Sequence, residues 1–207
     1  MKKNLVITIS REFGSGGREI GERVAKELNI PFYDREIILK TAENSGLSEE
    51  YIEKEEQKVT SSLLFNLSAG GKQEFPALAD RIFISQSGAI QEYAQEGSCV
   101  IVGRCADYIL KENKNCLNIF VHADKYFKLH RIMTKYGLDQ NEAEKKIKET
   151  DKRRSRHYRF YTSQEWGDAS NYHVCINSGK LGIDNAVNLI LNIANNFWES
   201  CFLTKQL

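Results

Sequence analysis

The sequence predicts an α/β fold, a three-layer arrangement in which helices cover a parallel central sheet. One observation is the opening of the chain, where an apolar, strand-like run is followed by a glycine-rich turn and then by a helical pattern. A second is that further apolar runs, each typical of a buried strand, alternate with helical stretches. Because parallel strands are usually joined through a helix, this alternation favours parallel pairing. The runs are Leu5–Ser10, Cys99–Val102, Leu117–Val121 and His173–Ile176.

The length and composition suit one folded domain. With 207 residues, of which 41% are hydrophobic and 28% charged, the chain can bury a core. We expect a single domain over residues 1–207, with a core formed by residues 1–35 and 97–207. Two segments, residues 36–96 and 150–170, are expected to be excursions from that core.

The composition also excludes several classes of partner. The net charge of +1 gives no overall field that would attract nucleic acid or a membrane surface, so neither is expected as a partner. No apolar run approaches the roughly 20 residues needed to span a bilayer, and the first apolar run is too short for a signal peptide. The five cysteines show neither a C-x-x-C pair nor metal-ligand spacing, which favours reduced thiols. A cytoplasmic protein is therefore expected.

The first helix and the second strand follow directly from the opening run. Apolar residues recur at helical spacing after the glycine turn, which predicts an amphipathic helix over Arg18–Asn29. Pro31 ends this helix because its ring and its missing N–H do not fit a helix interior. A second short extended segment, Pro31–Asp34, follows it.

Residues 36–96 are more polar and are predicted to be largely helical. Ser48, ahead of two glutamates, predicts the N-cap of a short acidic helix that runs to about Gln57. A flexible loop is expected at Ser68–Gly71. Helical spacing returns over Leu78–Glu96.

The second half of the chain is predicted to contain three longer helices. One is expected from Asp124 to about Tyr136. Asp139, with Glu142 three residues on, resembles a capping pair at the start of the next helix, which carries a dense basic stretch at its end. An amphipathic helix over Ile183–Trp198 is expected to close the domain.

The turn between the first strand and the first helix has the character of a phosphate-binding loop. Glycines let the backbone approach phosphate oxygens closely, and a helix N-terminus offers unpaired N–H groups and a positive dipole end. The G-x-x-x-x-G-K-[ST] pattern is incomplete, because no lysine follows the second glycine and Glu19 lies near the expected hydroxyl. A guanidinium binds phosphate through two donors, so Arg18 or Arg11 is a candidate for the missing cation. A glycine-rich turn without a ligand is the alternative.

Two charged residues follow other predicted strands. Arg104 comes just after Cys99–Val102, and Asp34 ends the second extended segment. Ligands of open α/β sheets bind at the carboxyl ends of strands, so both residues are expected at the same sheet edge as the glycine turn. An ordinary surface position is the alternative for each.

Four arginines within seven residues are the second informative feature. They are Arg153, Arg154, Arg156 and Arg159, interleaved with aromatic residues. Basic residues at a helix end commonly offset the helix dipole, which is the ordinary explanation. An arginine-rich lid would also compensate the charge of a migrating phosphoryl group while excluding water. Binding of single-stranded nucleic acid is a further alternative, and the near-neutral net charge argues against it.

Taken in order, several segments resemble the cytidylate kinase-like family. Ile7–Gly21 and Pro31–Arg35 resemble its opening. Val100–Asp107 resembles its second signature and the glycine-arginine-aspartate segment of bacterial cytidylate kinases, with Cys105 at the position of that aspartate. Asp151–Arg156 resembles the family's lid, and Trp166–Tyr172 resembles the segment downstream of that lid. The likeness spans nearly the whole chain.

The resemblance implies the P-loop fold of nucleoside monophosphate kinases, with a parallel core, a helical monophosphate-binding insertion and an arginine-rich lid. It implies γ-phosphoryl transfer from ATP to CMP or dCMP, with Mg²⁺. Bacterial cytidylate kinases carry a lysine in the loop, whereas this chain has Gly17 and Arg18 there. Two alternatives stay open: a regulatory protein that binds a nucleotide without turning it over, and a P-loop kinase that acts on a different small acceptor.

On this hypothesis the candidate residues divide by role. The phosphates of ATP would be held by Gly14, Ser15, Gly16, Gly17, Arg18 and Glu19. The acceptor would be bound by Asp34, Arg104 and Arg11. Catalysis would depend on Arg18, Arg153, Arg154 and Arg156. No residue is expected to ligate a metal directly, and Glu19 or Asp124 would meet Mg²⁺ through water.

Overall fold

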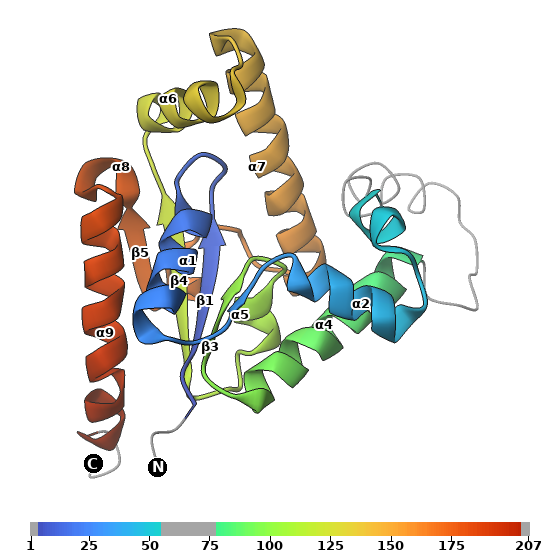
Figure 1. Ribbon diagram of the computed structural model, residues 1–207, viewed down its shortest axis with the longest axis vertical. Coiled ribbons are helices and arrows are strands. Elements are labelled where there is room, and N and C mark those ends of the chain that lie inside the picture. Colours follow the sequence, from blue (N-terminus) through green and yellow to red (C-terminus); the bar gives the residue numbers. More distant parts are fainter. Residues whose placement is uncertain (1–3, 55–77, 204–207) are drawn as a thin grey trace.

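The computed structural model describes residues 4–54 and 78–203, and within these ranges five strands form one all-parallel sheet (Figure 1). The strands are β1 (Val6–Arg11), β2 (Phe32–Tyr33), β3 (Cys99–Val102), β4 (Cys116–His122) and β5 (Val174–Asn177). Their order, β2-β3-β1-β4-β5, places β1 at the centre. The predicted α/β class with a parallel sheet is confirmed, and each strand end lies within one residue of its expected position.

The helices also follow the predicted order. They are α1 (Gly17–Leu28), α2 (Glu36–Ser45), α4 (Leu78–Glu96), α5 (Ala106–Ile109), α6 (Lys125–Tyr136), α7 (Gln140–Thr162), α8 (Ser178–Leu181) and α9 (Ile183–Leu203), with a further helical segment at 49–54. The short helices α5 and α8 were not predicted, because four residues are too few to show a helical period. The predicted helix end at Gln57 and loop at Ser68–Gly71 lie outside the described residues.

Two predicted helix starts are confirmed by their hydrogen bonds. The Ser48 hydroxyl accepts from the Tyr51 backbone N–H at 3.3 Å. Asp139 and Glu142 form a reciprocal capping box at the start of α7. The helix that begins there continues without a break to Thr162, so the basic stretch lies on its second half.

The alternation of side chains along β1 divides the apolar core between the two faces of the sheet. Ile7 and Ile9 face one side, where they pack with Ile20 of α1 and with α9. Val6 faces the other side and packs with Ile90 of α4 and with α5. Figure 1 shows these helices on the two faces of the sheet. None of the helices in the described ranges is long and apolar enough to cross a membrane.

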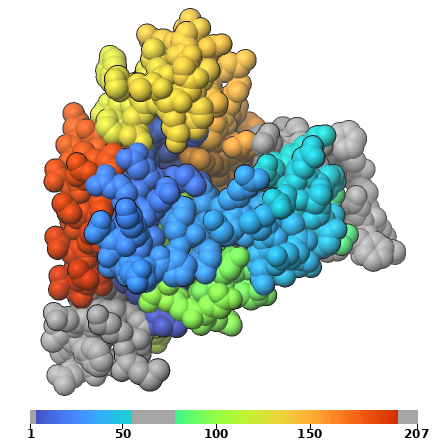
Figure 2. Space-filling view, viewed as in Figure 1, coloured from blue at the N-terminus to red at the C-terminus, as the bar shows by residue number. Residues whose placement is uncertain are grey.

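Helices α6 and α7 form a hairpin above the carboxyl edge of the sheet (Figures 1 and 2). The hairpin has its own small apolar core, in which Leu129 and Ile132 of α6 meet Ala143 and Ile147 of α7. Phe13, from the glycine turn, packs against this core. The turn and the hairpin are therefore joined by apolar contact, and their polar contacts define the site.

Candidate functional site

The glycine turn joins the central strand β1 to α1. Gly14 and Gly16 have φ angles of +86° and +83°, a left-handed region that favours glycine. An added Cβ at Gly16 would lie 2.5 Å from Ile183 Cδ1, and one at Gly17 would lie 2.5 Å from the Cβ of Arg11. Gly16 is also the N-cap of α1, without a side-chain cap, so the first N–H groups of the helix are open to an anion.

Polar contacts fasten this turn to the α6–α7 hairpin. The Phe13 backbone N–H donates to Asp151 Oδ1 at 2.6 Å. Lys128 Nζ lies 2.9 Å from Glu12 Oε2 and 3.5 Å from Asp151 Oδ2. Burial raises the pKa of Asp151, although the hydrogen bond from Phe13 and the charge of Lys128 oppose the rise. The sequence analysis did not identify Lys128, which stands between two carboxylates and holds the turn in place.

Arg131 of α6 borders the outer side of the turn. Its Nη2 lies 2.6 Å from Glu19 Oε2, in the first turn of α1. Its guanidinium also lies 3.5 Å from where a Cβ at Gly16 would be. Arg131 was not predicted as a site residue, because nothing in the local pattern of α6 distinguishes it. It brings a positive charge to the glycine turn, close to where the P-loop lysine is missing.

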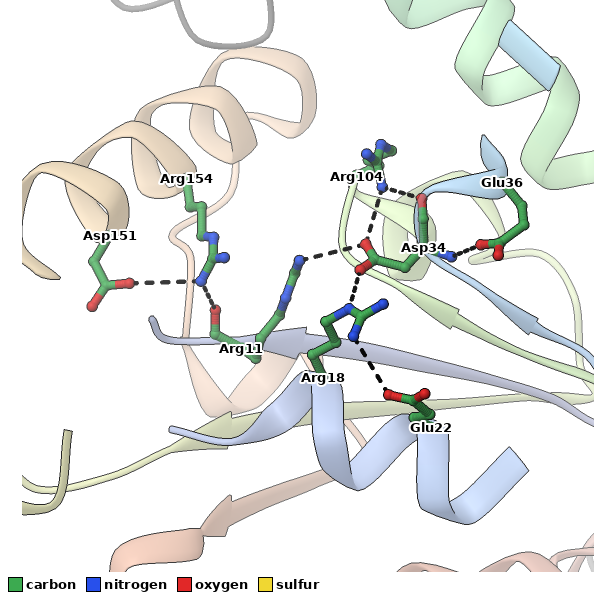
Figure 3. A network of polar contacts seen from close by, with 8 residues as sticks. All are labelled: Arg11, Arg18, Glu22, Asp34, Glu36, Arg104, Asp151 and Arg154. Carbon is green, nitrogen blue, oxygen red and sulfur yellow. Dashed lines mark hydrogen bonds and ion pairs between the residues drawn. The ribbon is translucent and has the colours of Figure 1, made fainter. Parts of the chain in front are cut away.

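Three arginines from three parts of the fold converge on Asp34 (Figure 3). Arg18 Nε donates to Asp34 Oδ2 at 2.7 Å. Arg104 Nη1 donates to the Asp34 carbonyl at 2.7 Å and lies 3.4 Å from Oδ1. Arg11 Nη2 lies 3.9 Å from Oδ1. Burial alone would raise the pKa of Asp34, but the charges of Arg11 and Arg104 and the hydrogen bond from Arg18 outweigh it and lower that pKa.

Asp34→Asn is expected to lower the free energy of unfolding at pH 7 by about 1–3 kcal/mol, because the variant loses charged hydrogen bonds at a largely buried site. The pKa of Asp34 is lower in the folded chain than in the unfolded chain. The ionised carboxylate therefore stabilises the folded state, and this contribution is complete above the unfolded pKa of about 4. The contribution is lost as the pH falls through the pKa that Asp34 has in the folded chain. Urea unfolding of the unaltered protein and of Asp34→Asn between pH 7 and pH 3 measures the difference in their free energies of unfolding. A difference that stays constant down to pH 3 would contradict the prediction.

A cavity of about 310 Å³ opens beside this cluster. The described residues that line it are Ser10, Arg11, Ile38, Glu53, Gly103, Arg104, Cys105, Arg153, Arg154, His157, Tyr158 and Trp166. Four of them are arginines, which come from β1, from the turn after β3 and from α7. Of the predicted lid arginines, Arg153 and Arg154 line the cavity, whereas Arg156 is exposed and does not. Asp34 is not part of the lining, but it holds two arginines that are.

The turn after β3 has an unusual backbone. Gly103, Arg104 and Cys105 have φ angles of +77°, +53° and +56°, so two residues with side chains occupy the left-handed region. That conformation costs roughly 1–2 kcal/mol per residue and is typical of functional sites. A Cβ at Gly103 would collide with the Arg11 guanidinium. Glycine at position 103 therefore leaves room for the Arg11 guanidinium to pass close to the backbone of the turn. Arg11 and Arg104 both line the cavity.

Arg154 connects α7 to both the cavity and the glycine turn. Its Nη1 donates to the Arg11 carbonyl at 3.0 Å, and its guanidinium lies 5.7 Å from the centre of the Phe13 ring. Nη1 also lies 3.9 Å from Asp151 Oδ1. Burial lowers the pKa of Arg154, which as a guanidinium still remains charged.

A buried carboxylate anchors α7 beneath the cavity. Asp107, only 3% exposed, accepts from the Tyr158 hydroxyl at 2.7 Å and from the Ser10 hydroxyl at 3.3 Å. Burial raises the pKa of Asp107, and the two hydrogen bonds oppose the rise. The sequence analysis missed this link, because it joins Tyr158 to a residue 51 positions away. It holds the basic half of α7 over β1.

Comparison with solved structures shows what the chain is similar to. An uncharacterized protein from Eubacterium ventriosum is 31% identical, with a TM-score of 0.70, over 92% of this chain and 98% of the other. A shikimate kinase from Bacteroides thetaiotaomicron is 15% identical, with a TM-score of 0.53, over 92% and 98%. A gluconokinase from Sinorhizobium meliloti is 12% identical, with a TM-score of 0.53, over 97% and 99%. None of the curated proteins compared with the chain matches it.

The two kinases show a shared fold, so the predicted P-loop kinase fold is confirmed. The family model described as "Cytidylate kinase-like family" matches residues 6–180, a span that begins with β1 and the glycine turn and includes the cavity. The match covers well over half of the chain. The chain belongs to the cytidylate kinase-like family.

Proposed function

We propose that the protein is an ATP-dependent nucleoside monophosphate kinase that phosphorylates CMP or dCMP. The observation that carries this proposal is the cavity with four arginines beside the glycine turn, where Arg11 adjoins both. Phosphoryl transfer between two anions depends on positioning and on compensation of charge, and this arrangement supplies both. The cavity also draws on the predicted insertion, through Ile38, and on the predicted lid, through Arg153 and Arg154.

Each part of the site then has a role. The backbone N–H groups of Gly14, Gly16 and Gly17, with Ser15, hold the phosphates of ATP, and Arg131 adds charge beside them. Arg104 and Arg11 bind the acceptor phosphate, and Asp34 acts as a positioning residue that orients both guanidinium groups. Arg153 and Arg154 compensate the charge of the transferring group. No general base is needed, because the acceptor phosphate is already an anion.

Two further residues, Arg18 and Arg156, were also predicted to take part in catalysis. Arg18 was predicted to bind phosphate, and in the structure its guanidinium pairs with Asp34 and with Glu22. A catalytic role for Arg18 or for the exposed Arg156 stays a prediction.

The residues of the site fit Mg²⁺ bound mainly by the nucleotide. Among the described residues there is no group of three or more His, Cys, Asp or Glu side chains that could hold a metal. Mg²⁺ keeps several waters and commonly binds through substrate phosphates. The carboxylate of Glu19, paired with Arg131, and that of Asp124, the N-cap of α6, would contact its water shell. When bound, the ion neutralises charge on the phosphates.

We also propose a cytoplasmic location, because three of the described cysteines are packed as thiols. Cys99, Cys105 and Cys116 are buried and free. Burial raises the pKa of the Cys99 and Cys116 thiols to about 12, which keeps them protonated and unreactive.

The test is an assay of the purified chain with ATP, Mg²⁺ and a panel of nucleoside monophosphates, extended to sugars and small acids. We expect CMP and dCMP to be the best acceptors, measured as diphosphate formed per ATP consumed. ATP binding without phosphorylation of any acceptor would overturn the proposal and favour a nucleotide-binding regulatory protein. The glycine at position 17, in place of the loop lysine, is the observation that favours that second candidate. Turnover only with sugars or small acids would identify a kinase for a different acceptor.

A further inference from the structure

Glu53 is the acidic residue among the described residues that line the four-arginine cavity. It lies on the helical segment 49–54, which Figure 1 shows in cyan across from α7. Arg153, Arg154 and His157 line the cavity from α7. The cavity therefore presents a carboxylate on the insertion as well as guanidinium groups on the sheet edge and on α7.

The contacts of the Glu53 carboxylate differ from those of the cavity arginines. Within the described residues it takes part in no hydrogen bond or ion pair, although it is partly shielded from solvent. By contrast, the cavity arginines Arg11, Arg104 and Arg154 each have protein partners. An ionised carboxylate accepts hydrogen bonds and donates none. Glu53 therefore favours a ligand group that carries N–H or O–H donors.

This combination of charges favours an acceptor that carries both an anion and a hydrogen-bond donor. The arginines need an anion, and Glu53 needs a hydrogen-bond donor on the same molecule. Cytosine carries an exocyclic amino group, which carboxylates accept from, whereas uracil carries a carbonyl oxygen at that place, which a carboxylate repels. At about 310 Å³, the cavity is at the lower end of the range for small-molecule sites, and so suits a single mononucleotide.

The other wall of the cavity does not offer an equivalent acceptor. Cys105 stands where the resemblance places an aspartate, and its side chain is 4% exposed. Burial raises the pKa of Cys105, so the thiol stays neutral and is only a weak hydrogen-bond acceptor. Of the described residues that line the cavity, Glu53 is therefore the one that presents a carboxylate.

We propose that Glu53 is a specificity residue that accepts from the exocyclic amino group of the acceptor base and selects cytosine over uracil. This inference rests on the proposed function, because it assumes that a nucleoside monophosphate occupies the cavity. It goes beyond that function by naming the group that reads the base. Glu53 takes no part in the transfer itself.

Equilibrium titration of the full chain with CMP and with UMP tests this without turnover. A non-hydrolysable ATP analogue and Mg²⁺ are present throughout. For the unaltered protein we expect CMP to bind about 10- to 100-fold more tightly than UMP. In Glu53→Gln the ratio of the UMP dissociation constant to the CMP dissociation constant should fall to within about threefold of one. The reason is that an amide presents either a donor or an acceptor to the base.

Two further variants separate specificity from folding. Glu50→Gln makes the same change of charge on the same segment, at an exposed residue outside the cavity lining, and should keep the preference for CMP. Glu53→Asp keeps a carboxylate and should keep most of the preference. An unaltered ratio in Glu53→Gln, a ratio near one in the unaltered protein, or binding of neither nucleotide would overturn the inference. Selective binding of CMP without phosphorylation would instead support it and overturn the proposed function.

Discussion

Arg154→Ala is expected to lower kcat for CMP phosphorylation about 10³-fold and to change the dissociation constant for ATP by less than about threefold. The Arg154 guanidinium lines the cavity and donates to the Arg11 carbonyl at 3.0 Å, at the end of the central strand. A charge at that place stabilises the migrating phosphoryl group more than it stabilises either bound nucleotide. Steady-state kinetics and calorimetric ATP titration measure the two quantities.

Arg159→Ala is the matched control on the same helix. The Arg159 side chain is 70% exposed and pairs with Glu165, so its loss should leave both kcat and ATP affinity unchanged. Arg154→Lys keeps the charge but not the planar fork, and should retain an intermediate rate. Because Arg154 also contacts the Phe13 ring, the melting temperature of each variant must be recorded. Equal losses of kcat and ATP affinity in a folded Arg154→Ala protein would contradict the assigned role.

Gly16→Val is expected to weaken ATP binding by more than about 100-fold. The φ angle of +83° at Gly16 is a conformation that β-branched residues rarely adopt. The added Cβ would also lie 2.5 Å from Ile183 Cδ1. The turn would have to shift, and its N–H groups would leave the positions that meet phosphate oxygens. Titration of the variant with ATP measures the loss.

Gly46→Val controls for the backbone penalty alone. Gly46 has a φ angle of +71°, and an added Cβ would meet nothing within 4 Å. A residue with a side chain in this left-handed conformation costs roughly 1–2 kcal/mol in both variants. Only Gly16→Val alters the glycine turn. We expect Gly46→Val to bind ATP normally. Normal ATP binding by a folded Gly16→Val protein would show that the turn does not hold the phosphates.

Local pattern was enough to predict most of the fold. The strand Cys99–Val102 was predicted with its observed boundaries, because a strand buried on both faces is an unbroken apolar run. The glycine turn and α1 were predicted because glycine content and helical spacing are properties of neighbouring residues. The helix after Asp139 was also predicted to carry the arginine stretch at its end, as α7 does. The four-residue helices α5 and α8 were not predicted, because they are too short to show a helical period.

The charged contacts of the site could not be predicted in the same way. Arg131 and Glu19 are 112 positions apart, and Lys128 and Glu12 are 116 apart. Such pairs form only after the sheet order brings α6 beside the glycine turn. Asp107 looked unremarkable in the sequence because its function as an anchor depends on burial and on the approach of Tyr158.

By itself, the sequence determined the α/β class, the order of the elements along the chain and the glycine turn between β1 and α1. These features depend on short-range hydrophobic periodicity and on the backbone freedom of glycine. Only the tertiary structure decided which charges lie near one another: Asp34 beside three arginines, and Glu53 in the lining of the same cavity as Arg153 and Arg154. Electrostatic and hydrogen-bond energies depend on the distance and burial of side chains, and no local pattern encodes the distance between segments far apart in the chain.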